Sequence, residues 1–443
     1  MAHRPRIVGV ICANHFIMMI TYLLILISVL PLSISASSAS KNQSQLKLLH
    51  VIFTHKLQSP LEEDTKYGLP KKLEYQYFLG NTYEMVNESK VDMYNLGVYL
   101  RQRYDDFLGE LYYPEVLRMR TSEYALSMIA GLLVNAGLWP PAPSQKWKDN
   151  LDWQPIPTEY EEVDKDTLFL GTLCPHFVAE EEGLIKTDEY INSAVSFHEP
   201  LFEYVSKHYG TTIKRPSEIA LLYTSLETIA ITDRNASLPA WAEGIFPNGE
   251  MMTVSLLAYD QLSRSTNQKR LNGGNFLKKI IDDSARVSTA NNTNGSVKNS
   301  RELKISIYSG EERNLVGVMQ ALNLWWSPHI PESGASIIFE LRYDESIEEH
   351  GFEIFYYTGV ENNETIALAV PGCAHFCPLN DFNRIVAEVL PIDEFLLCHA
   401  ELSVNTKNNI NSSVDSHQHR HFFPCHIPVL FSLFLVSEYQ VSC

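Results

Sequence analysis

Short apolar runs and helical periodicities alternate at the two ends of the chain. Residues 48–53 form an apolar run of the length and type found in buried parallel strands. Apolar side chains then recur every three or four residues, which predicts an amphipathic helix over 90–108. A second strand is predicted over 116–119, and an apolar helix over 123–138 is ended by the prolines that follow it.

The middle of the chain has a different pattern. Residues 153–284 show no series of strands, and Ile219, Leu222, Leu226 and Ile229 have a helical period. Strand patterns return after a polar loop over 288–300. These patterns predict three strands, over 303–307, 335–341 and 352–357, and a helix over 316–324 between the first and the second of them.

Strand-helix units at both ends with a helical insertion between them predict an α/β fold. We expect a doubly wound, mostly parallel sheet flanked by helices, with an inserted helical cap domain. The expected parts are a signal peptide (1–39), a first core segment (46–152), a helical cap (153–284), a second core segment (285–402) and an atypical C-terminal tail (403–443).

The N-terminus predicts entry into the secretory pathway. Arg4 and Arg6 precede a long apolar stretch, and small residues follow it, as in a signal peptide cleaved near Ala36 or Ala39. An uncleaved signal anchor is the alternative, because the apolar stretch is long enough to span a bilayer. After cleavage we expect no stable membrane span. We expect a secreted protein or one in the lysosomal lumen.

Seven glycosylation signals of the form Asn-x-Ser/Thr fit a lumenal or extracellular protein. They are at Asn42, Asn87, Asn235, Asn291, Asn294, Asn363 and Asn411.

Composition excludes several classes of function. The 443 residues include 35 Lys and Arg against 53 Asp and Glu, a formal net charge of −18, which argues against binding to nucleic acid or anionic lipid. Hydrophobic residues make up 45% of the chain, which excludes a disordered protein. Seven cysteines suit a large secreted domain with a few disulfide bridges.

Candidate site residues stand where three predicted strands end. Thr54, His55 and Lys56 follow the first strand and Arg120 follows the second. Glu311 and Glu312 come shortly after the third strand. A single His or Arg at a strand end is usually a structural residue, but the carboxyl ends of strands in an open α/β sheet line the ligand cleft. Their convergence favours a functional site.

These residues also lie in segments that resemble a known family. The segment 51–60, V-I-F-T-H-K-L-Q-S-P, resembles the histidine acid phosphatase signature V-I-F-R-H-G-x-R-x-P. Segment 120–123 (R-T-S-E) is similar to the family's R-S-T-D, and 308–312 (Y-S-G-E-E) to its Y-S-A-H-D. The resemblance covers about residues 48–398 and is to the prostatic, lysosomal and insect-venom branch.

The resemblance implies hydrolysis of phosphate monoesters at acid pH through a phosphohistidine, with no cofactor and no metal. His55 then stands at the nucleophile and Arg120 at the third phosphate-binding arginine. Thr54 and Gln58 replace the other two arginines, and Lys56 replaces a glycine. The remaining two departures are Glu311 for the distal His and Glu312 for the distal Asp that protonates the leaving alcohol.

Two missing arginines forfeit about 3–6 kcal/mol of interaction with phosphate, or about 10²–10⁴-fold. Glu312 keeps a carboxylic acid in place, and Lys56 supplies a cation without the guanidinium fork. We therefore expect a weak or inactive phosphatase. The alternative is a non-catalytic secreted binding protein that holds a small ligand in the same cleft.

The resemblance also implies disulfides Cys174–Cys398 and Cys373–Cys377, and it alone implies a homodimer. Cys425 and Cys443 have no counterpart in the family.

Overall fold

The computed structural model describes residues 44–56, 85–163, 165–210, 212–232, 238–290 and 302–399. All of them belong to one compact unit, Met1–Glu401. The predicted signal peptide and the C-terminal tail lie outside the described residues. No helix in the described part of the chain is both long and apolar enough to cross a membrane.

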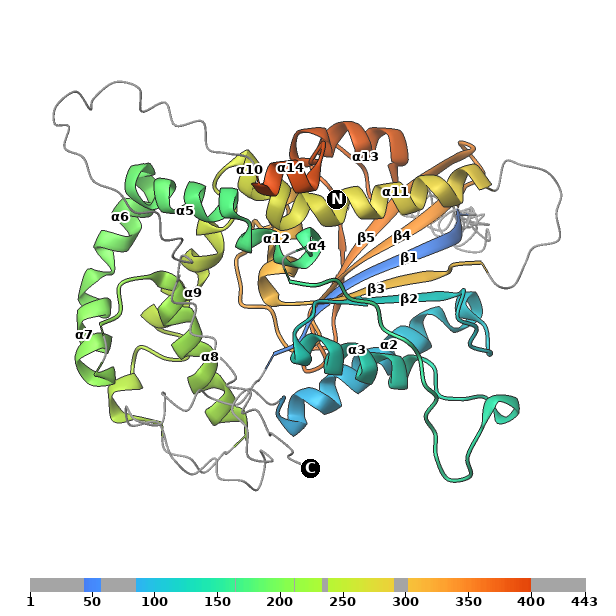
Figure 1. The fold of residues 1–443 in the computed structure, drawn as a ribbon, viewed down its shortest axis with the longest axis horizontal. Helices are drawn as coiled ribbons and strands as arrows, with labels where there is room; N and C mark the ends of the chain where they lie inside the picture. The colour runs from blue at the N-terminus through green and yellow to red at the C-terminus, as the bar shows by residue number, and fades with distance from the viewer. Residues whose placement is uncertain are drawn as a thin grey trace, which may run out of the picture. The chain divides into compact units, whose positions relative to one another are not determined.

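A central sheet has the strand order β2-β3-β1-β4-β5-β6, and β7 pairs with β5 (Figure 1). The strands are β1 (Ser44–Thr54), β2 (Leu117–Thr121), β3 (Ile305–Gly310), β4 (Ser336–Asp344), β5 (Glu349–Tyr357), β6 (Thr365–Leu368) and β7 (Cys377–Pro378).

The sheet is mixed, which refines the expectation of a mostly parallel sheet. Strands β1, β2, β3 and β5 run in one direction, and β4, β6 and β7 run in the other. Neighbouring strands are parallel only within β2-β3-β1, because the strands from β4 onward are joined by short connections that reverse the chain. The parallel part carries the candidate site.

Strand β1 has apolar side chains on both faces, as expected of a strand covered on both sides. Leu49, Val51 and Phe53 pack with helices α2 (Asn87–Leu108) and α3 (Ala125–Leu138). Leu48 and Ile52 belong to the cluster on the opposite face. That face is covered by α11 (Asn275–Ala290), α12 (Glu312–Ala321) and α13 (Leu379–Val386) (Figure 1). The α/β class with helices on both faces is confirmed.

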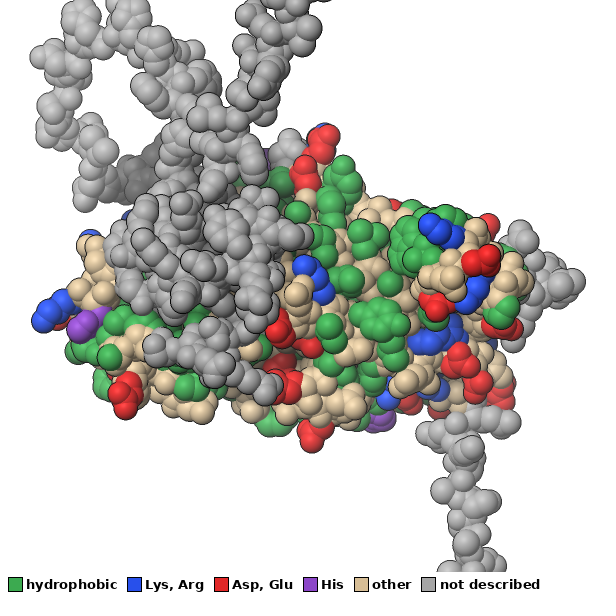
Figure 2. Space-filling model, turned by 90° about the horizontal axis from the view of Figure 1, so that it is seen from below, with side chains coloured by type: hydrophobic (Ala, Val, Ile, Leu, Met, Phe, Trp, Pro, Cys, Tyr) green, Lys and Arg blue, Asp and Glu red, His purple; other side chains and the backbone are tan. Residues whose placement is uncertain are grey.

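Helices α2 and α3 touch each other where both carry glycine. A Cβ atom on Gly97 would collide with the carbonyl oxygen of Val134, and one on Gly137 with that of Tyr94. The outer surface of this layer is partly apolar, since Tyr94 and Leu132 are among its exposed side chains. Figure 2 views the molecule from this side and shows hydrophobic side chains gathered on that face.

The helical insertion has its own apolar cluster, which includes Val205, Leu226 and Val254. We call the insertion the cap. Its longer helices are α5 (Pro175–Thr187), α6 (Glu189–Phe197), α7 (Glu199–Tyr209), α8 (Pro216–Thr232) and α9 (Glu250–Gln261), seen in green on the left of Figure 1. The short helical elements of the whole described chain, inside and outside the cap, are η2 (Pro143–Gln145), α4 (Thr167–Leu170), η3 (Gly171–Leu173), η4 (Ala240–Ala242), α10 (Thr266–Lys269), the π-helical turn η5 (Arg270–Gly274), η6 (Ala387–Val389) and α14 (Glu394–His399).

The cap is shorter than the sequence indicates. Helix α11 begins at Asn275, inside the range 153–284, yet it packs on the sheet. Its residues Phe276 and Ile280 lie on one face and join the core with Tyr308. This stripe has a helical period like that of the cap helices, so periodicity alone does not show which surface it covers.

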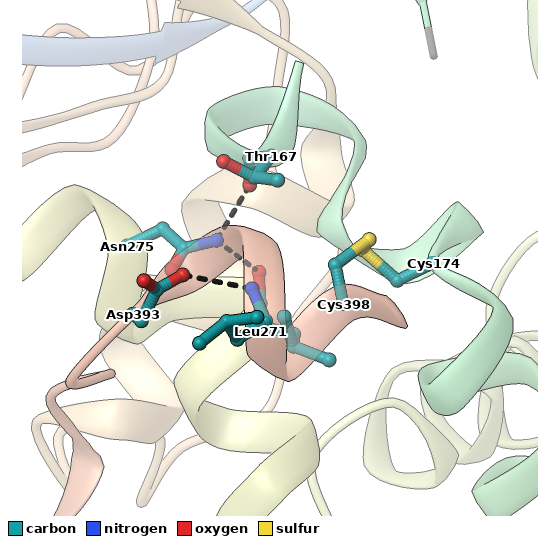
Figure 3. Close-up of a disulfide and its surroundings, with 7 residues drawn as sticks. Thr167, Cys174, Leu271, Asn275, Asp393 and Cys398 are labelled. Atoms are coloured by element: carbon teal, nitrogen blue, oxygen red, sulfur yellow. Dashed lines mark hydrogen bonds between the residues drawn. A yellow bond between two sulfur atoms is a disulfide. The ribbon is translucent and has the colours of Figure 1, made fainter. Parts of the chain in front are cut away.

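Two disulfides are present, with the pairing that the resemblance implies: Cys174–Cys398 and Cys373–Cys377. The first joins the residue before α5 to α14, and Leu271 of η5 packs beside it (Figure 3). Asn275 lies next to this region and donates from Nδ2 to the carbonyl of Thr167, at 2.6 Å. The bridge therefore ties the first cap helix to the C-terminal end of the core.

Candidate active site

The parallel strands bring the predicted site residues to one edge of the sheet. Thr54 at the end of β1 is opposite Gly310 of β3, and Thr121 at the end of β2 is opposite Ser309. His55 and Lys56 follow β1 directly, and Glu312 begins α12 after β3. Gln58 lies outside the described residues.

His55 is partly buried, and its Nε2 lies 3.3 Å from Oγ of Ser127 on α3. Ser127 is fully buried, and its carbonyl accepts from the Ser309 hydroxyl at 2.8 Å. Burial lowers the pKa of His55, although the nearby Glu311 carboxylate acts in the opposite direction. A neutral imidazole is the form that attacks phosphorus. Burial of His55 thus favours the protonation state that a nucleophile needs.

Thr54 is buried, and its hydroxyl donates to the carbonyl of His55 at 3.0 Å. Its backbone is held on both sides, because Thr54 N donates to Ala335 and Thr54 O accepts from Gly334, each at 3.0 Å. The short side chain therefore makes a local main-chain contact in place of the bidentate clamp of an arginine.

Lys56 is only 8% exposed and is surrounded by carboxylates. Its Nζ lies 2.5 Å from Oε2 of Glu227 on α8 and 3.9 Å from Oε1 of Glu312. The replacement of the expected glycine by lysine therefore adds a cation whose charge is already matched by protein groups.

Arg120 is also 8% exposed and paired. Its Nη2 lies 3.0 Å from Oδ2 of Asp166, Nη1 donates to the carbonyl of Thr121, and the guanidinium lies 5.3 Å from the ring centre of Phe169. Asp166 has a second role, because its Oδ1 accepts from Phe169 N at the start of α4. Burial raises the pKa of Asp166, and the Arg120 guanidinium opposes that rise.

Glu311 forms the N-cap of α12. The Asn314 side chain accepts from Glu311 N at 2.9 Å, the Glu311 side chain accepts from Asn314 N in return, and Arg313 Nη2 lies 2.9 Å from Glu311 Oε2. This reciprocal cap explains why the helix begins at Glu312, four residues before the start predicted from the apolar pattern.

Glu312 has the environment of a weak acid. Its Oε2 accepts from the Tyr259 hydroxyl of α9 at 2.8 Å. Burial raises the pKa of Glu312, with Glu227 and Glu311 adding to the rise and with Lys56 and Tyr259 opposing it. A carboxyl group that holds its proton at higher pH than usual is suited to protonate a leaving group.

Among the described residues that sequence reasoning missed at this site are Ser127, Asp166, Glu227 and Tyr259. Three of them lie in the loop before α4 and in the cap, more than 40 positions from the residues they contact, and none is part of a motif. Only the tertiary structure brings them to the strand ends. Within the described residues there is no group of three or more His, Cys, Asp and Glu placed to hold a metal ion.

Of the predicted glycosylation sites, Asn87 and Asn363 lie in the described part, and both are exposed. The other five lie outside it.

Known proteins resemble this chain in sequence, and solved structures resemble it in fold. The sequence model of the histidine phosphatase superfamily (branch 2) matches residues 34–356. Venom acid phosphatase Acph-1 of Apis mellifera is 32% identical over 369 residues, which cover 83% of this chain and 92% of that protein. Human lysosomal acid phosphatase is 26% identical over 314 residues, covering 70% and 71% of the two chains.

Among solved structures, Hafnia alvei phytase in complex with myo-inositol hexakis sulphate superposes with a TM-score of 0.58 at 14% sequence identity. The match covers 81% of this chain and 99% of the phytase chain. At this identity the likeness concerns the fold alone.

Proposed function

This chain belongs to the histidine phosphatase superfamily (branch 2), and we propose that it is a histidine acid phosphatase homologue with weak or no phosphatase activity. The observation that carries the proposal is the pairing of two described cations at the strand ends with carboxylates of the protein. Lys56 lies 2.5 Å from Glu227, and Arg120 lies 3.0 Å from Asp166.

Phosphoryl transfer needs uncompensated positive charge, because negative charge spreads over the phosphoryl oxygens in the transition state. Among the described residues of this site, Lys56 faces Glu227, Arg120 faces Asp166 and Arg313 faces Glu311. A dianionic phosphate therefore meets cations that are already paired, where the family signature has arginine.

Two features favour residual catalysis. Burial lowers the pKa of His55, which favours the neutral imidazole, and burial raises the pKa of Glu312, which favours the protonated acid. Nucleophile and acid thus retain their chemical states, and the defect concerns the binding of the phosphoryl group. We expect rates about 10²–10⁴-fold below those of a chain with the arginines restored.

The second candidate is a binding protein without catalysis. The carboxylates of Glu227 and Glu311 favour a ligand less anionic than a phosphate monoester. We propose a lumenal or extracellular location for either candidate, supported by the exposed glycosylation signals at Asn87 and Asn363 and by the venom and lysosomal phosphatases among the relatives.

The proposal is tested by hydrolysis of a chromogenic phosphate monoester at about pH 5. The purified chain is compared with His55→Ala and with a repaired chain that carries Thr54→Arg, Lys56→Gly, Gln58→Arg, Glu311→His and Glu312→Asp. We expect little or no turnover in the wild type and at least 10²-fold more in the repaired chain.

Turnover in the wild type equal to that of the repaired chain, and abolished by His55→Ala, would contradict the proposal. Stabilisation by vanadate gives a second readout, because an anion that binds the folded state raises the melting temperature. A vanadate shift in the repaired chain without one in the wild type would locate the defect in binding of the anion.

A further inference from the structure

Lys56, which follows β1, contacts the cap through Glu227. Its ammonium group approaches Oε2 of Glu227 to 2.5 Å, and only 5% of the Lys56 side chain is exposed. Glu227 comes from α8, whose neighbouring residues Tyr223 and Leu226 are buried in the apolar cluster of the cap. The carboxylate is therefore placed by the packing of the cap rather than by the sheet.

Glu312, which also has a carboxylate oxygen within 4 Å of the Lys56 ammonium, is less able to neutralise that charge. Oε1 of Glu312 is 3.9 Å from the ammonium, and Oε2 of Glu312 accepts from the Tyr259 hydroxyl. Burial also raises the pKa of Glu312, which favours its neutral form. Glu227 is thus the main partner of Lys56.

We propose that Glu227 is a specificity-determining residue that competes internally with anionic ligands for Lys56. The inference rests on the proposed function and deepens it by assigning part of the impaired phosphate binding to a cap residue outside the family motifs. A carboxylate and a phosphate offer the same kind of charged oxygen acceptor to an ammonium group. A phosphoryl group that reaches Lys56 must displace the Glu227 carboxylate or lie beside it.

Removal of the competing charge should therefore increase the affinity for phosphate. The substitution Glu227→Gln keeps the length of the side chain and removes its charge. We expect the dissociation constant for inorganic phosphate, measured by calorimetry on the full chain, to fall by about ten- to a hundredfold, the worth of one hydrogen bond to a charged group.

The control variant is Glu203→Gln. Glu203 is an exposed residue of α7 in the same cap and lines a separate cavity of about 450 Å³. The substitution Glu203→Gln removes the same charge from the molecule. A similar gain in phosphate affinity in this variant would show that the effect comes from net charge, and it would overturn the proposal.

A double substitution separates competition from a general change in the cap. In a chain with both Glu227→Gln and Lys56→Met, the gain in phosphate affinity should disappear, because the cation that Glu227 releases is absent. A gain that persists without Lys56, or no gain in the single variant, would overturn the inference. Glu227→Ala provides a second neutral variant should Glu227→Gln fail to fold.

The binding measurement is independent of turnover. A wild-type chain that proved fully active would overturn the proposed function, whereas the change in phosphate affinity on loss of Glu227 would still decide this inference.

Discussion

Two histidines on one short segment differ in their surroundings and therefore in their roles. His55 follows β1 at the candidate site, whereas His50 lies within β1, fully buried on the face covered by α11. Nε2 of His50 lies 3.3 Å from the Ser284 hydroxyl, and Nδ1 lies 3.5 Å from the Tyr308 hydroxyl. His50 is a structural residue that fills a polar niche in the core.

His50 should make the stability of the chain depend on pH. Burial, with smaller contributions from Lys279 and Arg118, lowers the pKa of His50 to about 3. The unfolded chain, with a histidine pKa of about 6.5, then takes up a proton that the folded chain excludes. The free energy of unfolding should therefore fall as pH decreases below about 6.5, and His50 should account for about 2 kcal/mol between pH 7 and pH 5.

Urea denaturation at several pH values measures this contribution. His50→Phe should reduce the loss of stability between pH 7 and pH 5 by about 2 kcal/mol relative to the wild type. Between pH 7 and pH 8 the free energy of unfolding should change equally with pH in the two chains, since the His50 imidazole is then neutral in both the folded and the unfolded state. If the free energy of unfolding also changed equally with pH in the two chains below pH 6.5, His50 would have to accept its proton in the folded state.

At the scale of the elements, the position of the α2–α3 layer depends on two glycines. Gly97 and Gly137 let the backbones of the two helices touch, and both helices then reach the apolar side chains of β1. Helix propensity alone disfavours glycine inside a helix. The close approach of the two helix backbones is the physical reason for glycine at positions 97 and 137.

Gly137→Ala should therefore destabilise the chain, although alanine is the better helix former. The added methyl group meets the backbone oxygen of Tyr94, so the helices must move apart. We expect a loss of about 2 kcal/mol in the free energy of unfolding, within the range for overpacked cores.

Gly183→Ala is the matched control, because a Cβ atom there meets no other atom within 4 Å. This substitution inside α5 should stabilise the chain by about 0.5–1 kcal/mol. Thermal or urea unfolding of the two variants checks both signs, and a stabilising Gly137→Ala would contradict the close crossing.

At the scale of the whole molecule, the two disulfides close loops of very different length. Cys174 and Cys398 are 224 positions apart, and Cys373 and Cys377 are 4 apart. A cross-link stabilises a protein mainly by restricting the unfolded chain, and the effect grows with the logarithm of the loop length. The first bridge also connects the cap to the end of the core, so its effect concerns the whole unit.

Loss of the long bridge should cost more than loss of the short one. We expect about 5 kcal/mol for Cys174→Ala with Cys398→Ala and about 2 kcal/mol for Cys373→Ala with Cys377→Ala. Denaturation of the two double variants under oxidising conditions measures the difference. Equal losses would show that local packing, rather than loop closure, determines the contribution of each bridge.

Much of the architecture could be predicted from local patterns. The strands at β1, β2, β3, β4 and β5 and the helices α2 and α3 follow from runs and periodicities of apolar residues, to within a few positions. The motif around His55 indicates the family, and Thr54, Gln58 and Glu311, which replace two arginines and a histidine of that motif set, already indicate a loss of positive charge. Each of these features depends on residues close together in the chain.

Other features depend on residues far apart. The direction of the strands after β3, the packing of α11 on the sheet and the partners of the site cations are set by tertiary contacts. The sequence by itself determined which charges stand at the strand ends. Only the tertiary structure decided that Glu227 neutralises Lys56 and that Asp166 neutralises Arg120. An ion pair forms where packing brings two side chains together, and no local sequence pattern predicts which distant residues will be in contact.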